Sequence, residues 1–107
     1  MSESIQVITT TSTRKNAEKI ANVLVKNRLA ACVQLIDPMA SIYRWDDKIR
    51  RSSEVLCLVK TRRDLYKAVE LSIHNNHIYK TPEILAIPAI ECSEDYWKWI
   101  LEATHKT

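Results

Sequence analysis

Four side chains that could do chemistry lie in one short segment: His77, Tyr79, Pro82 and Glu83. An imidazole nitrogen and a carboxylate oxygen both suit copper or zinc, so the first hypothesis is a metal or small-molecule cleft with His77 and Glu83 as ligands. Tyr79 and Pro82 would shape this cleft, because the residue before a proline is held extended. A structural alternative stays open, in which Glu83 pairs with a lysine or with backbone donors.

Three cysteines, Cys32, Cys57 and Cys92, are spaced far apart. Cys32 and Cys57 lie in apolar runs, where a thiol is usually a small core residue, although Cys32 could also shape a cleft or bind Cu(I). Cys92 precedes a helix start and is expected to be the most exposed thiol, but acidic neighbours oppose a reactive thiolate. The odd number and wide spacing predict reduced thiols and a cytoplasmic protein.

Catalytic alternatives find little support in the residues. The chain has no glycine, which excludes glycine-rich phosphate loops and dinucleotide fingerprints. The hydroxyl-rich run before Arg14 could hold an anion at a helix N-terminus, as in an acylphosphatase, but helix capping is the favoured interpretation. With no paired carboxylates and no Ser/His/Asp set, we predict a protein that is not an enzyme and requires no cofactor.

The overall composition limits which kinds of binding partner we expect for this chain. The 107 residues carry a net charge of +3 from 16 basic and 13 acidic side chains, which is too mild and too dispersed for a nucleic-acid surface. No apolar run approaches the ~20 residues of a membrane span, and the first residues do not resemble a signal peptide. We expect one domain over residues 1–107, with neither nucleic acid nor membrane as partner.

The first half of the chain predicts a strand, a helix and two long strands. Residues 5–9 are mostly β-branched and predict a strand. Ser12 or Thr13 then caps a helix whose apolar positions recur with a helical period. Residues 29–36 form the next strand, Pro38 bends it, and residues 41–45 continue it. Asp46 and Asp47 make a turn, and residues 48–60 return with apolar side chains on both faces, which is typical of a central strand.

The second half predicts a helix, a strand and a last helix. Thr61 is the expected cap of a helix that buries Leu65, Ala68, Val69 and Ile73 and ends at residues 75–76. Residues 83–87 form a strand that Pro88 stops, and Ser93 begins the final helix. The order β-α-β-β-α-β is the ferredoxin-like α+β sandwich, here with a terminal helix. It predicts an antiparallel sheet with two helices on one face and the other face bare.

The two long strands are longer than a small sheet needs, so their ends form an arm that extends beyond it. We expect this arm and the bare sheet face to pair with further copies of the same chain. Tyr43 and Trp45 near the arm tip, and Trp97 on the last helix, are the predicted interface residues, because buried aromatic anchors are typical of such contacts.

Three segments resemble the CutA family of divalent-cation tolerance proteins. They are residues 29–33 (LAACV), residues 38–61 with SIYRW and KT, and residues 77–84 (HIYKTPEI), and the resemblance extends over about residues 5–103. It implies a ferredoxin-like subunit in a homotrimer, with each arm pairing to a neighbour. The implied location is cytoplasmic in bacteria, or organellar or in the secretory pathway in eukaryotes. It also implies a response to metal ions, with binding of copper or other divalent cations.

The chain departs from that family pattern at defined positions. Thr9 and Asn76 stand where some members have a copper-binding cysteine and a second histidine, and Ile78 stands where proline is usual. Met39 and Asp47 replace common glycines. The trimers of this family are similar in shape to nitrogen-regulatory signalling proteins, which leaves an alternative function open: a non-catalytic trimeric small-molecule sensor or scaffold.

Overall fold

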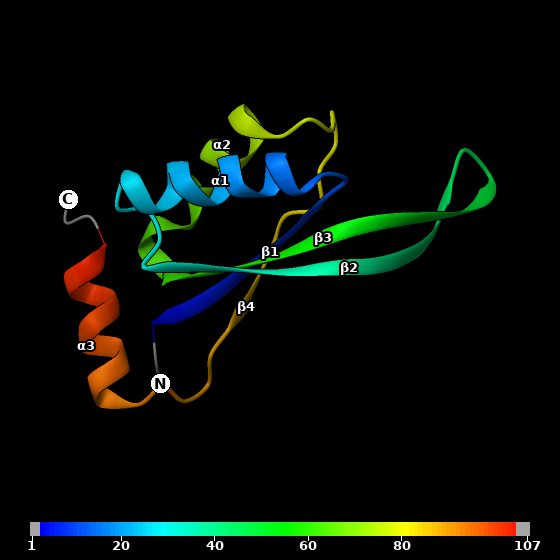
Figure 1. Ribbon diagram of the computed structural model, residues 1–107. Helices are drawn as coiled ribbons and strands as arrows, with labels where there is room; N and C mark the ends of the chain where they lie inside the picture. The colour runs from blue at the N-terminus through cyan, green and yellow to red at the C-terminus, as the bar shows by residue number, and fades with distance from the viewer. Residues whose placement is uncertain (1–2, 105–107) are drawn as a thin grey trace.

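A four-stranded antiparallel sheet and three helices make up the computed structural model, which describes residues 3–104 (Figure 1). The elements are β1 (Ser4–Thr11), α1 (Arg14–Lys26), β2 (Cys32–Trp45), β3 (Lys48–Arg62), a 3-10 turn (Arg63–Leu65), α2 (Tyr66–Asn76), β4 (Leu85–Pro88) and α3 (Glu94–Ala103). The strand order β2-β3-β1-β4 confirms the expected ferredoxin-like α+β fold and the central place of β3. The predicted domain over 1–107 extends beyond the described residues at both ends.

The main core lies between the sheet and helices α1 and α2. Side chains of a strand alternate between its faces, and Val7 of β1 and Val59 of β3, which pair directly, both point to the helices and are fully buried. On the helices, Leu24 and Ile73 are also fully buried. Ala68 is exposed, so the predicted buried stripe of α2 is confirmed only at Leu65, Val69 and Ile73.

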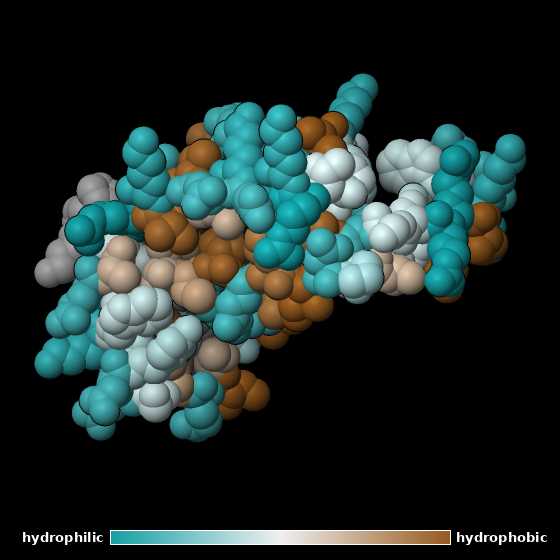
Figure 2. All heavy atoms as spheres, viewed as in Figure 1, coloured by the Kyte–Doolittle hydropathy of each residue, from teal (hydrophilic) through white to brown (hydrophobic). Residues whose placement is uncertain are grey.

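The opposite face of the sheet is apolar and largely uncovered. By the strand register, one row of hydrophobic side chains shares this face: Ile8, Ile36, Leu56, Leu58, Leu85 and Ile87. Helix α3 covers one end of it, where Ile100 is buried. Figure 2 shows hydrophobic surface along the lower edge of the molecule and at the arm tip. The predicted bare face is therefore present except beneath α3.

Strands β2 and β3 continue beyond the sheet as a two-stranded arm, which gives the molecule extents of 44 × 26 × 22 Å (Figure 1). A bulge between Ile36 and Met39 bends β2 where the arm begins, near the predicted Pro38 bend. At the tip, Asp46 and Asp47 have φ of 52° and 62°. Two successive residues in the left-handed region form the turn that matches the twist of a hairpin, and Asp tolerates that region better than most residues.

Three local predictions were wrong. Strand β4 spans Leu85–Pro88 rather than residues 83–87, and Pro88 pairs with Ile5 inside the strand instead of stopping it. Thr61 does not cap α2: it is a buried residue of β3, and its hydroxyl donates to the Leu29 carbonyl at 2.6 Å. Helix α2 instead begins after the 3-10 turn, and Asp64 forms an ion pair with Arg62 at 2.6 Å. Strand β2 starts at Cys32 rather than Leu29, because residues 29–31 connect the end of α1 to the sheet edge. The caps Thr13 and Ser93 are confirmed.

None of the helices in residues 3–104 combines the length and the apolar character needed to cross a bilayer.

The arm turn gives the first prediction. Replacing Asp47 with glycine should raise the free energy of unfolding by about 0.5–1 kcal/mol, because a φ of 62° is unstrained for glycine. Asp47→Val should lower it, since a β-branched side chain resists this conformation. Urea denaturation of the three proteins at one concentration measures both effects. If Asp47→Gly were the least stable of the three, the turn geometry would be contradicted.

Candidate functional site

A cleft lies between the arm and the loop that joins α2 to β4. Its volume is about 560 Å³. In Figure 2 the surface is hollowed between the body of the molecule and the arm. The cleft combines hydroxyls, aromatic rings and charges of both signs; it is lined by Ser41, Tyr43, Trp45, Arg50, Glu54, Tyr79, Lys80, Thr81 and Glu83.

His77 anchors the loop to the end of β1. Its Nε2 lies 2.8 Å from the Thr10 carbonyl oxygen, and its Nδ1 accepts a hydrogen bond from the Tyr79 backbone N–H at 2.9 Å. Because Nδ1 is an acceptor, the imidazole is neutral and Nε2–H is the donor to Thr10. Burial lowers the pKa of His77, although the Thr10 carbonyl opposes this shift. Both ring nitrogens are therefore engaged within the protein.

Asn16 fixes the residue that precedes His77. Its Oδ1 accepts a hydrogen bond from the Thr11 hydroxyl at 2.7 Å, and its Nδ2 donates to the Asn76 carbonyl at 2.9 Å. Asn16 lies in the first turn of α1 and is buried. A buried amide with both ends paired is strongly oriented, so Asn16 holds the end of β1 and the end of α2 together.

Tyr79 joins the loop to the base of the arm. Its hydroxyl donates to Oε2 of Glu54 at 2.7 Å. Burial, together with the Glu54 carboxylate, raises the pKa of Tyr79 to about 12, so the phenol stays protonated as the donor. Glu54 is only 8% exposed, and within residues 3–104 no ion pair joins it to a basic side chain. The cleft wall thus contains a buried carboxylate that accepts a hydrogen bond from the neutral hydroxyl of Tyr79.

The two predicted metal ligands face different surroundings. Glu83 is exposed and lines the cleft, whereas His77 is turned toward Thr10 and is not part of the lining. A metal ion on His77 would have to displace one of its two hydrogen-bond partners. No group of three or more His, Cys, Asp or Glu side chains suited to a metal ion occurs in the described part of the chain. The donors that are open to a cation in the cleft are oxygen atoms, which suit hard divalent ions better than soft ones.

The other predicted residues are divided between the cleft and the rest of the molecule. Tyr79 lines the cleft and Pro82 is half-buried in the same loop. Tyr43 and Trp45 line the cleft from the arm, and the Tyr43 hydroxyl is 2.7 Å from that of Ser52. Trp97 is half-buried on α3.

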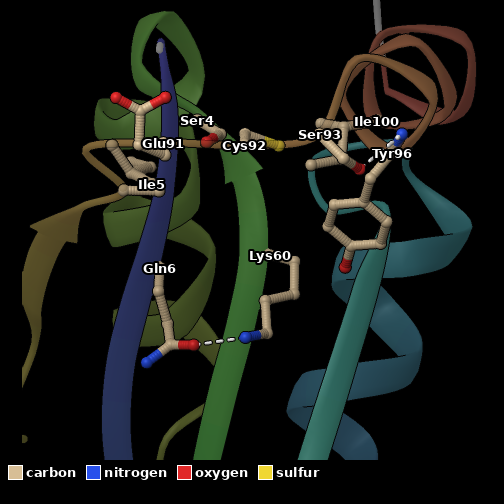
Figure 3. A pocket seen from close by; sticks show the side chains of 10 residues that line it. Ser4, Ile5, Gln6, Lys60, Glu91, Cys92, Ser93, Tyr96 and Ile100 are labelled. Atoms are coloured by element: carbon tan, nitrogen blue, oxygen red, sulfur yellow. Dashed lines mark hydrogen bonds between the residues drawn. The ribbon is translucent and has the colours of Figure 1, made fainter. Parts of the chain in front are cut away.

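Cys32 lies away from the cleft, on the uncovered sheet face beside α3. It pairs with Lys60 across the β2–β3 ladder. Burial, with Cys32 and Cys92 nearby, raises the pKa of Tyr96. A second pocket of about 310 Å³ lies here, and Figure 3 shows Lys60 and Gln6 joined by a hydrogen bond, with the Tyr96 ring across the pocket from Gln6. All three cysteines are free, and burial raises the pKa of Cys57 to about 11, which keeps that thiol protonated and inert.

The hydroxyl run before α1 serves the fold. Thr13 accepts from the Asn16 backbone N–H at 3.1 Å as the helix cap, and Thr11 bonds the Asn16 side chain. Arg14 forms ion pairs with Glu18 at 3.1 Å and Asp37 at 3.8 Å. The predicted capping role is confirmed, and Thr11, Thr13 and Arg14 of the run are occupied by these contacts.

Glu54 is the site residue that the sequence interpretation did not select. It continues, with a period of two, the face of β3 that holds Leu56 and Leu58. A carboxylate in line with apolar neighbours signals a buried, partnered side chain. That signal was available in the sequence, but its partner Tyr79 is 25 residues away and could not be read from local pattern.

A family model, curated relatives and solved structures all match this chain to the same family. The family model described as CutA1 divalent ion tolerance protein matches residues 5–103. The divalent-cation tolerance protein CutA of Pyrococcus horikoshii is 39% identical over 95% of this chain and 99% of its own length. The chloroplastic protein CutA of Arabidopsis thaliana is 36% identical over 94% of this chain, which spans only 56% of that protein. The solved structure of the Thermus thermophilus divalent cation tolerance protein superposes with a TM-score of 0.93 at 35% identity, covering 95% of this chain and 99% of that one.

The environment of His77 predicts a pH dependence of stability. Its pKa is lowered in the folded protein, so the unfolded chain binds more protons in mild acid. The contribution of neutral His77 is complete above the unfolded pKa of about 6.5 and is lost as pH falls through the folded pKa. Urea denaturation between pH 7.5 and 5 should show a smaller loss of stability for His77→Gln than for the parent. Asn75→Gln, which changes an exposed side chain of α2 that does not titrate, is the control. An NMR-measured His77 pKa of 6.5 or more would contradict the assignment.

Proposed function

Because this chain belongs to the CutA1 divalent ion tolerance protein family, we propose that it is a homotrimeric, non-catalytic protein that binds copper or another divalent cation. The proposal rests mainly on one observation in the site: the exposed carboxylate of Glu83 opens into a cleft that hydroxyl groups also line. Carboxylates and hydroxyls are ligands for divalent cations. Such binding would lower the free concentration of a cation without any chemical step.

Self-association is supported by the apolar surface of the single chain. On the arm, alternate residues face away from the cleft, and among them Ile42 and Ile49 are 66% and 65% exposed. The uncovered sheet face adds Ile36, Leu85 and Ile87, all more than two-fifths exposed. Apolar surface of this extent is unfavourable on a free monomer and is typical of an interface. Tyr43, Trp45 and Trp97 stay in the proposed interface as its aromatic anchors.

Glu83 is the proposed primary ligand of the cation, because its side chain is already open to the cleft. His77 would join it only after Nδ1 gives up the Tyr79 N–H, which couples metal binding to a movement of the loop. The remaining ligands would be water molecules or groups of a neighbouring subunit. Deprotonated ligands are required, so this binding would weaken in acid.

A second candidate function is favoured by the basic residues of the cleft. The cleft is lined by two basic side chains, Arg50 and Lys80, as well as by the two acidic ones. Three aromatic rings, those of Tyr43, Trp45 and Tyr79, also line it. A site built for a bare cation gains nothing from basic side chains, whereas an organic ligand with polar groups does. The alternative is therefore a trimeric small-molecule sensor or scaffold.

We also propose a cytoplasmic location, with no nucleic-acid or membrane partner. The three free thiols, one of them fully buried, fit a reducing compartment. Cell fractionation that placed the chain outside the cytoplasm would contradict this part of the proposal.

The trimer is tested by light scattering after size exclusion. The expected solution mass is three times the 12.4 kDa of one chain, with or without added Cu(II). Trp45→Glu and Ile49→Glu should each weaken assembly, because a charge would be buried in the interface. Lys67→Glu, at a side chain that is 91% exposed on α2, is the control and should remain trimeric. A monomeric parent protein would overturn the proposal.

Cation binding is tested by calorimetric titration of the native protein with Cu(II), Zn(II) and Mn(II). Glu83→Gln should weaken binding about tenfold or more, since one charged ligand is lost, which corresponds to ~1.4 kcal/mol. Glu18→Gln removes an exposed carboxylate from α1 and should bind as the parent does. The same titration of His77→Ala shows whether the imidazole joins the ligand set. The absence of binding in the parent, or unchanged binding in Glu83→Gln, would contradict the proposed site.

A further inference from the structure

Glu54 is the buried carboxylate of the cleft. Glu54 is more than nine-tenths buried, and one of its oxygens accepts from Tyr79. Removing a carboxylate from water costs several kcal/mol unless a positive partner compensates. Within residues 3–104 it has no ion pair. A positively charged group entering the cleft beside Glu54 would supply that partner.

The walls near Glu54 favour an organic cation. Tyr43, Trp45 and Tyr79 all line the cleft. The face of an aromatic ring attracts an ammonium group, and the gain increases when the pair is removed from water. A bare divalent metal ion would instead need several oxygen or nitrogen ligands at short range. The combination of one buried carboxylate and three rings therefore matches an ammonium group.

The cleft also carries a complementary site for negative charge. Arg50 and Lys80 contribute basic groups from the arm and from the loop. Arg50 is oriented by a hydrogen bond from its Nε to the Trp45 carbonyl at 3.4 Å, at the arm tip. A guanidinium and an ammonium are the groups that bind carboxylates most strongly in proteins. A ligand carrying both charges would complement both signs of charge in the cleft.

We propose that this cleft binds a small zwitterion of the amino-acid class, with its ammonium group on Glu54 between the rings and its carboxylate on Arg50 and Lys80. A volume of about 560 Å³ is ample for a free amino acid. The inference rests on the proposed role of the cleft as a binding site, but it does not need a metal ion. In this proposal Glu54 and Tyr79 recognise the ammonium group, and Glu83 remains the proposed metal ligand.

The test is a titration of the native protein with the twenty free L-amino acids, in EDTA, followed by calorimetry and by ¹H–¹⁵N chemical shifts. At least one should bind, with shifts at residues 43–54 and 79–83. The N-acetyl derivative and the carboxamide of the best binder each lack one charge and should bind at least tenfold more weakly. These two derivatives test the charge requirement on the unaltered protein. If no amino acid binds, or if the N-acetyl derivative binds equally well, the proposal is overturned.

Variants of the cleft residues, titrated with the same amino acid, show which side chains bind it. Glu54→Gln removes the charge but keeps an oxygen acceptor for Tyr79, and it should weaken binding of the same amino acid at least tenfold. Arg50→Gln should weaken it as well. Glu18→Gln, which removes an exposed carboxylate from α1 outside the cleft, is the matched control and should leave binding unchanged. Equal binding by Glu54→Gln and the parent would overturn the assignment.

The two proposals for the cleft fail separately. Amino-acid binding in EDTA with no binding of Cu(II), Zn(II) or Mn(II) would support the zwitterion site and remove the metal proposal. Metal binding that Glu83→Gln weakens, with no amino acid bound, would support the metal proposal and overturn this inference.

Discussion

The hydrogen bond from Tyr79 to Glu54 is the contact on which the cleft depends. It joins a loop that leaves α2 to the strand β3, 25 residues earlier, at the point where the arm begins. The loop reaches this position because Asn16 and His77 fix its first residues against the end of β1. Each link pairs a buried polar group, and breaking one would leave a partner unsatisfied at a cost of about 1–3 kcal/mol. The arm and the loop are thereby held as two walls of one site.

Much of the fold was predictable because its signals are local. The apolar period of α1, the caps Thr13 and Ser93, and the apolar faces of β3 all indicated elements that the structure contains. Thr61 could not be placed, because its hydroxyl is used by the distant Leu29 carbonyl rather than by a helix end. The sequence marked the turn at residues 46–47 through its two aspartates, and both adopt positive φ.

The site was predictable only in part, since its chemistry depends on tertiary contacts. The segment around His77 and Glu83 was identified from residue types, and Glu83 does line the cleft. The direction of the His77 ring follows from Thr10 on β1, which no local pattern specifies. The chain belongs to the divalent ion tolerance family, whereas the mixture of acids, bases and rings in the cleft is the basis of the proposed zwitterion site. The two proposals are compatible if metal and organic ligand use different carboxylates.

A double-mutant cycle on Tyr79 and Glu54 tests the central claim most directly. The free energies of unfolding of the parent, Tyr79→Phe, Glu54→Leu and the double variant would be measured at one protein concentration, because assembly contributes to stability. A hydrogen bond to a buried carboxylate predicts a coupling energy of about 1.5 kcal/mol or more between the two positions. Additive effects, with a coupling energy near zero, would contradict the claim that this bond joins the loop to the arm.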